Sequence, residues 1–331
     1  MIADVVVGLQ FGDEGKGKVT HQLARNGNYT HVMRFNGGCN AGHTIYHEGK
    51  KFVTHHVPAG VFYGIPSIIG PGCVIDVAKL FKEIESLESN GIEVYDNLLI
   101  SENAHIITDF HRAEDKKEEK IGTTRTGNGP AYRDKYFRKG LRAVDVPELR
   151  EFLVDVFGEL HYEDSTGKEP EVLCEGAQGF GLDIDWGDYP YVTSSHCTTG
   201  GAILSGVPHD SIRDVYGVAK VYETYVGSKN FETEDPVFEL LRSAGDEYGA
   251  TTGRPRQIGW LDSHSLVKSV LLNGVNKLIL NKADILDNIK TWRAWDGDQL
   301  LCFENSDEME QWVGSLFPEI LTIFSRSPSE I

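Results

Sequence analysis

A glycine-rich loop near the N-terminus has the residue types and the spacing that bind a phosphate. From Gly12 to Lys18 the chain nearly follows the pattern in which backbone N–H groups and a lysine surround the phosphates of a nucleotide. Val19 stands where that pattern has a Ser or Thr hydroxyl for Mg2+, so Asp13 becomes the candidate metal ligand. By itself the segment could equally be a glycine-rich turn with solvated lysines.

A second motif could select the base of a nucleotide. Asn281, Lys282 and Asp284 follow an apolar run that ends at Leu280. An aspartate placed there can accept hydrogen bonds from guanine N1–H and the 2-amino group, whereas a base without these donors would leave the carboxylate unpaired. An ordinary turn after a strand uses the same residue types. Together with the phosphate loop, the motif favours a guanine nucleotide.

Other glycine- and hydroxyl-rich segments carry single candidate residues. His43 ends a second glycine-rich turn, and although a lone histidine is usually structural, Asn40 in the same turn makes it a candidate. Hydroxyl groups that could hold a monophosphate occur in residues 121–131 and 193–201. Arg254 and Arg256 lie in a flexible frame that suits a dicarboxylate such as aspartate. Each of these segments could also be a plain surface loop.

The elements that must position these motifs are short apolar runs separated by helical patterns. The runs cover residues 4–7, 31–35, 171–174, 215–218 and 277–280, and the first is followed by a predicted helix over residues 16–24. This alternation predicts an α/β fold with a mainly parallel central sheet, crossover helices and a P-loop-like nucleotide site. We expect one domain over residues 1–331 with loop insertions, and solvated loops at residues 112–120 and 163–170.

Composition excludes several classes of protein. The net charge of −18 would repel a nucleic acid. The five cysteines lack the short spacing of a zinc or redox site, which favours free buried thiols. Neither a stretch of about 18 apolar residues nor a signal segment is evident, so we expect a cytoplasmic protein without a membrane partner.

The order of the motifs resembles that of the adenylosuccinate synthetases along nearly the whole chain. The matching stretches are Gly-Asp-Glu-Gly-Lys-Gly-Lys at 12–18, Asn-Ala-Gly-His-Thr at 40–44, Ile-Gly-Thr-Thr at 121–124, Glu-Gly-Ala-Gln-Gly at 175–179, Tyr-Pro-Tyr-Val-Thr-Ser-Ser at 189–195, Ala-Thr-Thr-Gly-Arg at 250–254 and Lys-x-Asp at 282–284. The length is similar to that of the short archaeal and phage members, which lack a helical insertion.

The resemblance implies a ligase that joins L-aspartate to C6 of a 6-oxopurine monophosphate, driven by GTP through a 6-phosphoryl intermediate. It implies that Asp13 is the base at purine N1, that His43 is the acid assisting phosphoryl transfer, and that Gln178 completes the catalytic set. Mg2+ would be held by Asp13 and the Gly42 carbonyl.

The resemblance also assigns binding residues by position. GTP would be bound by Gly12, Glu14, Gly15, Lys16, Gly17, Lys18, Gly42, Thr44, Arg256, Lys282, Asp284, Ser325 and Ser327. The purine monophosphate would be bound by Asp13, Lys16, Asn40, Thr124, Arg138, Gln178, Thr198, Val226 and Arg254, with Arg138 supplied by the partner subunit of a homodimer. Aspartate would be bound by Thr251, Thr252, Arg254 and Arg256.

The chain departs from the family pattern at residues 123–127, 227–231, 254–257 and 325–328, which alters the segments facing the ribose and the donor base. Two acceptors therefore stay open. IMP is favoured, and dGMP, possibly with ATP as donor, is the alternative used by phage relatives that make a 2-amino-2′-deoxy product in the host cytoplasm. Those relatives commonly replace the loop aspartate with serine, whereas Asp13 is present here. A guanine-nucleotide switch is a third alternative, but Val19 after Lys18 argues against it.

Overall fold

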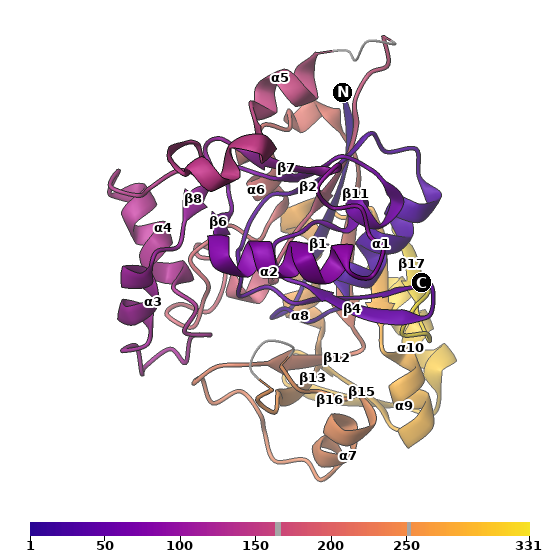
Figure 1. Cartoon of the computed structure of the whole chain (residues 1–331). Coiled ribbons are helices and arrows are strands. Elements are labelled where there is room, and N and C mark those ends of the chain that lie inside the picture. Colours follow the sequence, from indigo (N-terminus) through magenta and orange to yellow (C-terminus); the bar gives the residue numbers. More distant parts are fainter. Residues whose placement is uncertain (163–166, 250–252) are drawn as a thin grey trace.

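A sheet of nine parallel strands runs through the centre of the computed structural model, which describes residues 1–162, 167–249 and 253–331 (Figure 1). Its order, β17-β14-β11-β1-β10-β2-β5-β7-β9, places the N-terminal strand near the middle. The strands are β1 (Ile2–Gly8), β2 (His31–Arg34), β5 (Ser67–Ile69), β7 (Leu98–Ser101), β9 (Leu153–Val154), β10 (Glu171–Glu175), β11 (Ile212–Lys220), β14 (Lys277–Asn281) and β17 (Leu321–Phe324).

The central strands are buried because helices cover the sheet. Val5, Val6 and Val7 of β1 are fully buried, and an uninterrupted apolar run of this kind is typical of a parallel strand covered on both faces. The helices are α1 (Lys16–Asn26), α2 (Val77–Glu88), α3 (Asp109–Asp115), α4 (Asn128–Tyr136), α5 (Val156–His161), α6 (Thr199–Leu204), α7 (Val237–Ala244), α8 (Ser263–Asn273), α9 (Ala283–Ile289) and α10 (Ser306–Leu316). The predicted α/β class with a parallel sheet is confirmed.

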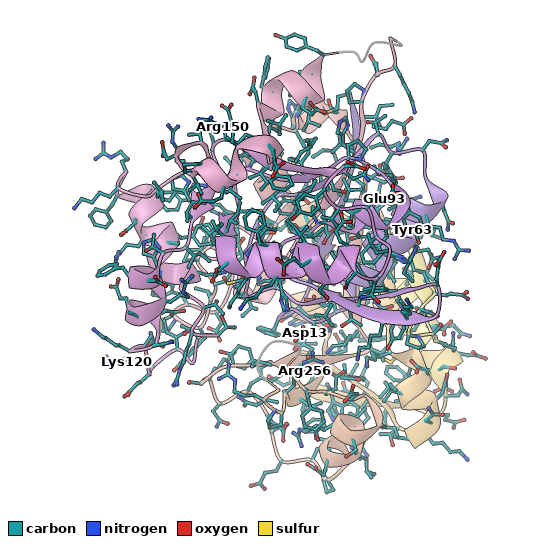
Figure 2. The ribbon with its side chains drawn as sticks, in the orientation of Figure 1. Asp13, Tyr63, Glu93, Lys120, Arg150 and Arg256 are labelled. Atoms are coloured by element: carbon teal, nitrogen blue, oxygen red, sulfur yellow. The ribbon has the colours of Figure 1, made fainter. Side chains whose placement is uncertain are left out.

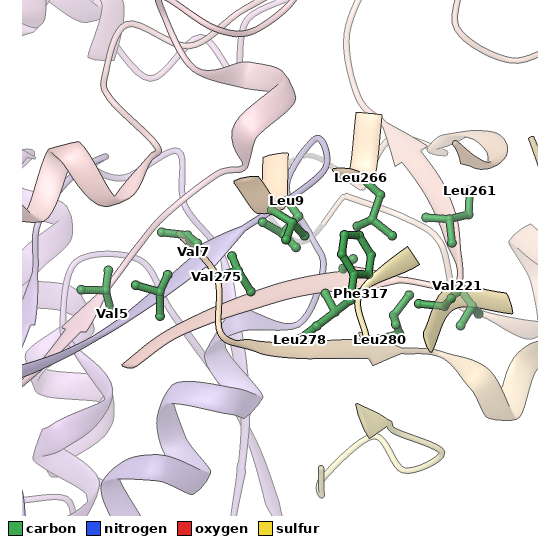
Figure 3. Close-up of a cluster of buried hydrophobic side chains, with 14 of the residues drawn as sticks. Val5, Val7, Leu9, Val221, Leu261, Leu266, Val275, Leu278, Leu280 and Phe317 are labelled. Atoms are coloured by element: carbon green, nitrogen blue, oxygen red, sulfur yellow. The ribbon is translucent and has the colours of Figure 1, made fainter. Parts of the chain in front are cut away.

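A smaller sheet of four strands lies at the lower side of the molecule in Figure 1. Its strands are β12 (Tyr222–Tyr225), β13 (Gln257–Asp262), β15 (Trp292–Asp296) and β16 (Gln299–Phe303), in that order. One cluster of buried apolar side chains extends from Val5 and Leu9 of the large sheet to Leu261 of the small one (Figure 3). This shared core fixes the two sheets relative to one another.

Short hairpins and turns complete the chain. The strand pair β3 (His43–His47) and β4 (Lys50–Thr54) is antiparallel, and β6 (Val74–Ile75) pairs with β8 (His105–Ile106) in parallel. The 3-10 helices are η1 (Ala59–Tyr63), η2 (Ala143–Asp145), η3 (Pro147–Phe152), η4 (Phe180–Leu182) and η5 (His209–Ser211).

Two sequence-based expectations need correction. Residues 112–115 are not a loop but the second half of α3, which begins with a capping box at Thr108 and is held by an ion pair between Arg112 and Asp76. Cys302 is exposed, because it points outward from a strand of the small sheet, whereas the other four cysteines are buried thiols as expected.

The remaining expectations from the sequence concern a loop, membrane-spanning helices and the number of domains. Of the predicted loop 163–170, residues 167–170 have no regular structure and 163–166 lie outside the described part. Among the described residues, no helix is long and apolar enough to span a membrane. The single domain stays a prediction.

Candidate active site

The glycine-rich loop joins β1 to α1 and is braced from within by Glu14. This buried carboxylate accepts hydrogen bonds from the backbone N–H groups of Gly12 (2.8 Å) and Gln10 (3.2 Å) and forms an ion pair with Lys16 at 2.5 Å. Gly15 caps α1 with φ 94°, and a Cβ there would lie 2.7 Å from the amide nitrogen of Asn281. The loop therefore holds a fixed shape with a helix N-terminus at its end.

The base-selecting motif is attached directly to this loop. The side-chain amide of Asn281, at the end of β14, donates to the Glu14 carbonyl at 2.7 Å. Lys282 follows with φ 69°, and Asp284 then lies in the first turn of α9, half-buried and lining the same cleft as the loop. The two motifs, far apart in the sequence, thus form one continuous wall.

Lys18 extends this wall toward residues 325–328. Its Nζ donates to Ser325 Oγ at 2.6 Å and to the Ser327 carbonyl at 2.8 Å. Burial lowers the pKa of Lys18 to about 8, although the nearby Asp284 carboxylate opposes the shift. Ser327 and Pro328 line the cleft, whereas the buried Ser325 is not among the described residues that line it.

His43 stands across the cleft in a buried cluster with Glu175 and Arg34. Its Nδ1 lies 2.6 Å from Glu175 Oε1 and 3.2 Å from Arg34 Nη2, and Arg34 also forms an ion pair with Glu175. The second Glu175 oxygen accepts from the backbone N–H of Ala59 at 2.9 Å. Because a carboxylate at 2.6 Å requires a donor, Nδ1 carries a proton and Nε2 is the ring nitrogen left for other contacts.

Charges in this cluster determine how its members ionise. Burial and the Arg34 guanidinium lower the pKa of His43 to about 4, with Glu175 opposing the shift. Burial alone would raise the pKa of Glu175, but Arg34 and His43 outweigh it and bring that pKa down to about 2. Glu175 is therefore ionised at neutral pH, beside a neutral histidine.

Asp13 lies between the large and the small sheet, paired with Arg256 (Figure 2). Arg256 Nε is 2.9 Å from Asp13 Oδ2, and the Asp13 side chain is 30% exposed. The ion pair involves Asp13 Oδ2, so this arginine does not engage the other carboxylate oxygen, Oδ1. The candidate base and the candidate aspartate-binding arginine are thus in direct contact.

The residues predicted to bind the purine monophosphate, apart from Arg138 and Thr198, line the same cleft. Gln178 has φ 58° and donates through Nε2 to Asn40 Oδ1 at 3.2 Å. Thr124 contacts the Thr126 hydroxyl at 2.8 Å, and Arg254 donates to the Gly122 carbonyl at 3.2 Å. Asn40, Thr124, Gln178, Val226 and Arg254 all line the cleft.

The cleft has a volume of about 970 Å³, at the upper end of the range for small-molecule sites. Besides the acceptor residues, the predicted residues that line it are Gly12, Asp13, Glu14, Gly15, Lys16, Gly17, Lys18, Gly42, His43, Thr44, Arg256, Lys282, Asp284 and Ser327. The structure therefore brings the phosphate loop, the base motif, His43 and both arginines around one cavity.

Besides Ser325, four predicted residues are not among the described residues that line the cleft. Arg138 follows α4 with φ 60°, is exposed, and is not among the described residues lining the cleft. Thr198, the residue before α6, is buried. Its role in binding the purine monophosphate stays a prediction. Thr251 and Thr252 lie outside the described residues.

Other residues in or beside the cleft were missed as individual candidates. Tyr191, Thr193 and Ser194 line it, from the stretch that carries the family resemblance. Arg34 and Glu175 were missed as the partners of His43. Glu175 opens the Glu-Gly-Ala-Gln-Gly stretch, which was the available signal for it, whereas nothing in the sequence marked Arg34.

A cluster of Asp183, Asp185 and His196 has side-chain ligand atoms within 4.8 Å of one another. Asp183, however, already accepts from the backbone N–H groups of Asp185 (2.9 Å), Trp186 (3.1 Å) and Cys197 (2.6 Å). These bonds shape the turn before the cleft-lining segment 191–194. The cluster is thus accounted for by local structure.

Comparisons with known proteins agree along the whole chain. The family model described as adenylosuccinate synthetase matches residues 5–155 and 146–295. The adenylosuccinate synthetase of Chlorobium chlorochromatii strain CaD3 is 43% identical over 90% of this chain and 81% of its own, and that of Bacteroides fragilis strain YCH46 is 38% identical over 99% and 88%.

Two solved structures are also similar. The fully ligated adenylosuccinate synthetase from Plasmodium falciparum has a TM-score of 0.88 at 30% identity, covering 98% of this chain and 97% of its own. The cyanophage S-2L succinoaminodeoxyadenylate synthetase bound to dGMP and dATP as an energy donor has a TM-score of 0.77 at 23% identity, covering 99% and 93%. At that identity the second match shows the fold alone.

Proposed function

The chain belongs to the adenylosuccinate synthetase family and is a GTP-dependent ligase, and on this premise we propose that it condenses L-aspartate with IMP. The products are adenylosuccinate, GDP and phosphate. The observation that carries the proposal is the convergence of Asp13, His43 and the guanine motif at Asp284 on a single cleft. A switch protein would need the phosphate loop and Asp284, but it would have no use for the other two.

In the proposed reaction, Asp13 accepts the proton from purine N1, which makes O6 the nucleophile. O6 attacks the γ-phosphorus of GTP and GDP departs. The aspartate amine then adds at C6 and loses a proton, and phosphate leaves with O6. Phosphorylation of O6 replaces a poor, hydroxide-like leaving group with phosphate.

His43 would act on the transferred phosphoryl group through Nε2. In the protein alone its pKa is about 4, so the ring is neutral at pH 7. Negative phosphates brought beside Nε2 would favour the protonated ring, because an adjacent anion stabilises the cation. Glu175 already accepts from Nδ1 and would compensate that positive charge. The histidine would thus become an acid when the donor nucleotide is bound.

Mg2+ fits this site through hard oxygen ligands. The Asp13 carboxylate is partly exposed at the phosphate loop, and Gly42 lines the same cleft, so the carboxylate and the Gly42 carbonyl are the proposed ligands. When bound, Mg2+ would neutralise charge on the phosphates during transfer.

The remaining cleft residues divide between three ligands. Lys16, Gly17, Thr44, Lys282 and Asp284 would hold GTP, with Asp284 accepting from guanine. Asn40, Thr124 and Gln178 would hold the purine monophosphate, and Arg254 and Arg256, with Thr251 and Thr252, the aspartate. Tyr191, Thr193 and Ser194 also line the cleft and are added as candidate binding residues.

Incubating the purified protein with L-aspartate and GTP plus either IMP or dGMP tests the acceptor. We expect succinylated product and phosphate with IMP. The rival acceptor, dGMP, stays open because the chain departs from the family pattern at residues 227–231, whereas the presence of Asp13 favours IMP. If only dGMP gives product, dGMP and not IMP is the acceptor. If neither nucleotide gives product, the proposed reaction is refuted. ATP in place of GTP tests the donor in the same assay.

The active unit is proposed to be a homodimer that shares Arg138. Its exposed position away from its own cleft agrees with a contact to the partner's acceptor phosphate. Mixing Arg138→Leu with Asp13→Ala protein should restore activity, up to roughly a quarter of the wild-type level if subunits exchange randomly. Subunit exchange without recovered activity would refute the shared site.

A further inference from the structure

A fully buried carboxylate, Glu247, lies behind the cleft and was not marked by any sequence motif. Its side chain accepts a hydrogen bond from Tyr222 OH at 2.6 Å and forms ion pairs with Lys220 at 3.4 Å, with Lys282 at 3.8 Å and with Arg256. The relative exposure of the Glu247 side chain is 0%, so its charge is compensated only by these neighbours.

In the proposed reaction, two of these partners serve the binding of different substrates. Arg256 contacts Asp13 through Nε and is proposed to bind aspartate, whereas Lys282 belongs to the donor-base motif. The Glu247 carbonyl also accepts a hydrogen bond from the Arg256 backbone N–H at 3.0 Å. Arg254, which is also proposed to bind aspartate, lies two residues before Arg256 in the sequence.

The charges of the cluster do not cancel. Lys220, Arg256 and Lys282 are three cations, whereas Glu247 and Asp13 are two carboxylates. Burial would raise the pKa of Glu247, but the three cations outweigh it and hold that pKa near 2. Among the groups in direct contact the cations outnumber the carboxylates by one, although burial lowers the pKa of Lys220 to about 8.

We propose that Glu247 is a positioning residue that couples the aspartate site to the donor-nucleotide site by fixing Arg256 and Lys282 at once. This inference rests on the proposed function, since it names the ligands of the two sites. Without the Glu247 charge, Arg256 would retain Asp13 as its ion-pair partner, and Lys282 would keep its 2.6 Å hydrogen bond to the Gly245 carbonyl but lose its longer ion pair with Glu247. Aspartate and GTP would then both be bound less well, although Glu247 touches neither.

Glu247→Gln in the full-length protein tests the proposal, because the amide keeps the shape and removes the charge. We expect KM for L-aspartate to rise about 10-fold or more, as for loss of a charge-assisted contact, and KM for GTP to rise by a smaller factor. KM for the purine monophosphate should rise least of the three, because Asn40, Thr124 and Gln178 make their described contacts outside the cluster and Asp13 meets it only through Arg256. Glu247→Asp, which keeps the charge, should recover part of the loss.

Asp235→Asn is the matched control in the same part of the molecule. Asp235 accepts from Trp260 Nε1 and Arg293 Nη1, each at 3.0 Å, and touches no residue placed in the cleft. It should lower the melting temperature without changing any KM. If Glu247→Gln does not fold, Tyr222→Phe and Glu247→Asp test the proposal instead. Both should raise KM for L-aspartate and KM for GTP by smaller factors.

Unchanged KM values for aspartate and GTP in well-folded Glu247 or Tyr222 variants would overturn the inference. An equal rise of all three KM values would also overturn it, because that result indicates general damage to the cleft. Failure of the proposed function is distinct: the wild-type protein would then make no succinylated product. Binding of a fluorescent GTP analogue to wild type and Glu247→Gln would still test the donor half of the coupling.

Discussion

Two of the buried carboxylates, Glu175 and Glu247, have opposite effects through the same kind of contact. Glu175, at the end of β10, has one guanidinium and one neutral imidazole as partners, and it fixes which nitrogen of His43 carries a proton. Glu247, in a loop, has three cations as partners and leaves a positive charge in excess. The first cluster prepares a proton-transfer group and the second prepares a site for anions.

The difference follows from the elements that carry them. Glu175 and Arg34 stand on adjacent strands of the large sheet, directly opposite in the parallel register. Glu247 depends on ion pairs with Lys220 at the end of β11, Lys282 in the turn after β14 and Arg256 in the segment before β13. We therefore expect the Glu175 cluster to be the more rigid of the two, since sites built on strands are held more precisely than sites on loops.

Asp13→Ala should have the largest effect on turnover. Asp13 is the proposed base, and it contacts the Glu247 cluster through Arg256. We expect at least about a 1000-fold loss of turnover, from a general-base contribution of about 100- to 10,000-fold and the lost metal ligand. Steady-state rates with IMP measure it, and circular dichroism checks the fold. Near-normal activity would refute the assigned role.

Glu175→Gln isolates the other cluster. The amide can no longer compensate a protonated His43, so we expect about a 100-fold loss of kcat with little change in the KM for aspartate. Arg34 would also lose its buried partner, so a lower melting temperature should accompany the loss. A raised KM for aspartate with intact kcat would mean that the two clusters are not separate in function.

Asp284→Asn sharpens the comparison at the donor base. The neutral amide cannot accept both guanine donors with the same strength, so the preference for GTP over ATP should narrow by about 1 to 3 kcal/mol. The ratio of kcat/KM for the two donors is the measurement. Equal use of GTP and ATP by the wild type would instead point to the altered segment 325–328 and refute the choice of GTP.

The smallest effect concerns stability against pH. Both Glu175 and Glu247 have pKa values lowered from 4.5 to about 2 in the folded protein, so each stabilises the fold fully above pH 4.5 and ceases to do so as the pH falls toward 2. The urea midpoint should therefore fall steeply over that window. Glu175→Gln should make the pH dependence shallower, and an unchanged slope would contradict the lowered pKa.

Much of this architecture was predictable from the sequence, for identifiable reasons. Buried parallel strands such as β1 and β14 read as uninterrupted apolar runs, and the phosphate loop and base motif follow such strands directly. The helix at 109–115 was partly missed because its residues are mainly polar and its signal is a capping box. A local sequence pattern therefore suffices to predict an element whose residues are continuously buried.

The contacts between distant segments were not predictable in the same way. Nothing local pairs His43 with Glu175, or Glu247 with Lys220, because each pair is formed by the packing of separate strands and loops. The family resemblance supplied the roles of Asp13 and His43 but not these partners. The resemblance assigned Thr198 from a hydroxyl-rich stretch, and only the path of the chain shows that Thr193 of the same stretch lines the cleft.

The central position of β1 has a consequence for synthesis on the ribosome. Its neighbours in the sheet are β10 and β11, which begin at Glu171 and Ile212. At about 5–20 residues per second, the apolar strand waits on the order of ten seconds for its first partner to be made. During that time Val5, Val6 and Val7 are an unpaired strand open to aggregation or to chaperones, so slower translation of residues 9–170 should lower the yield of folded protein.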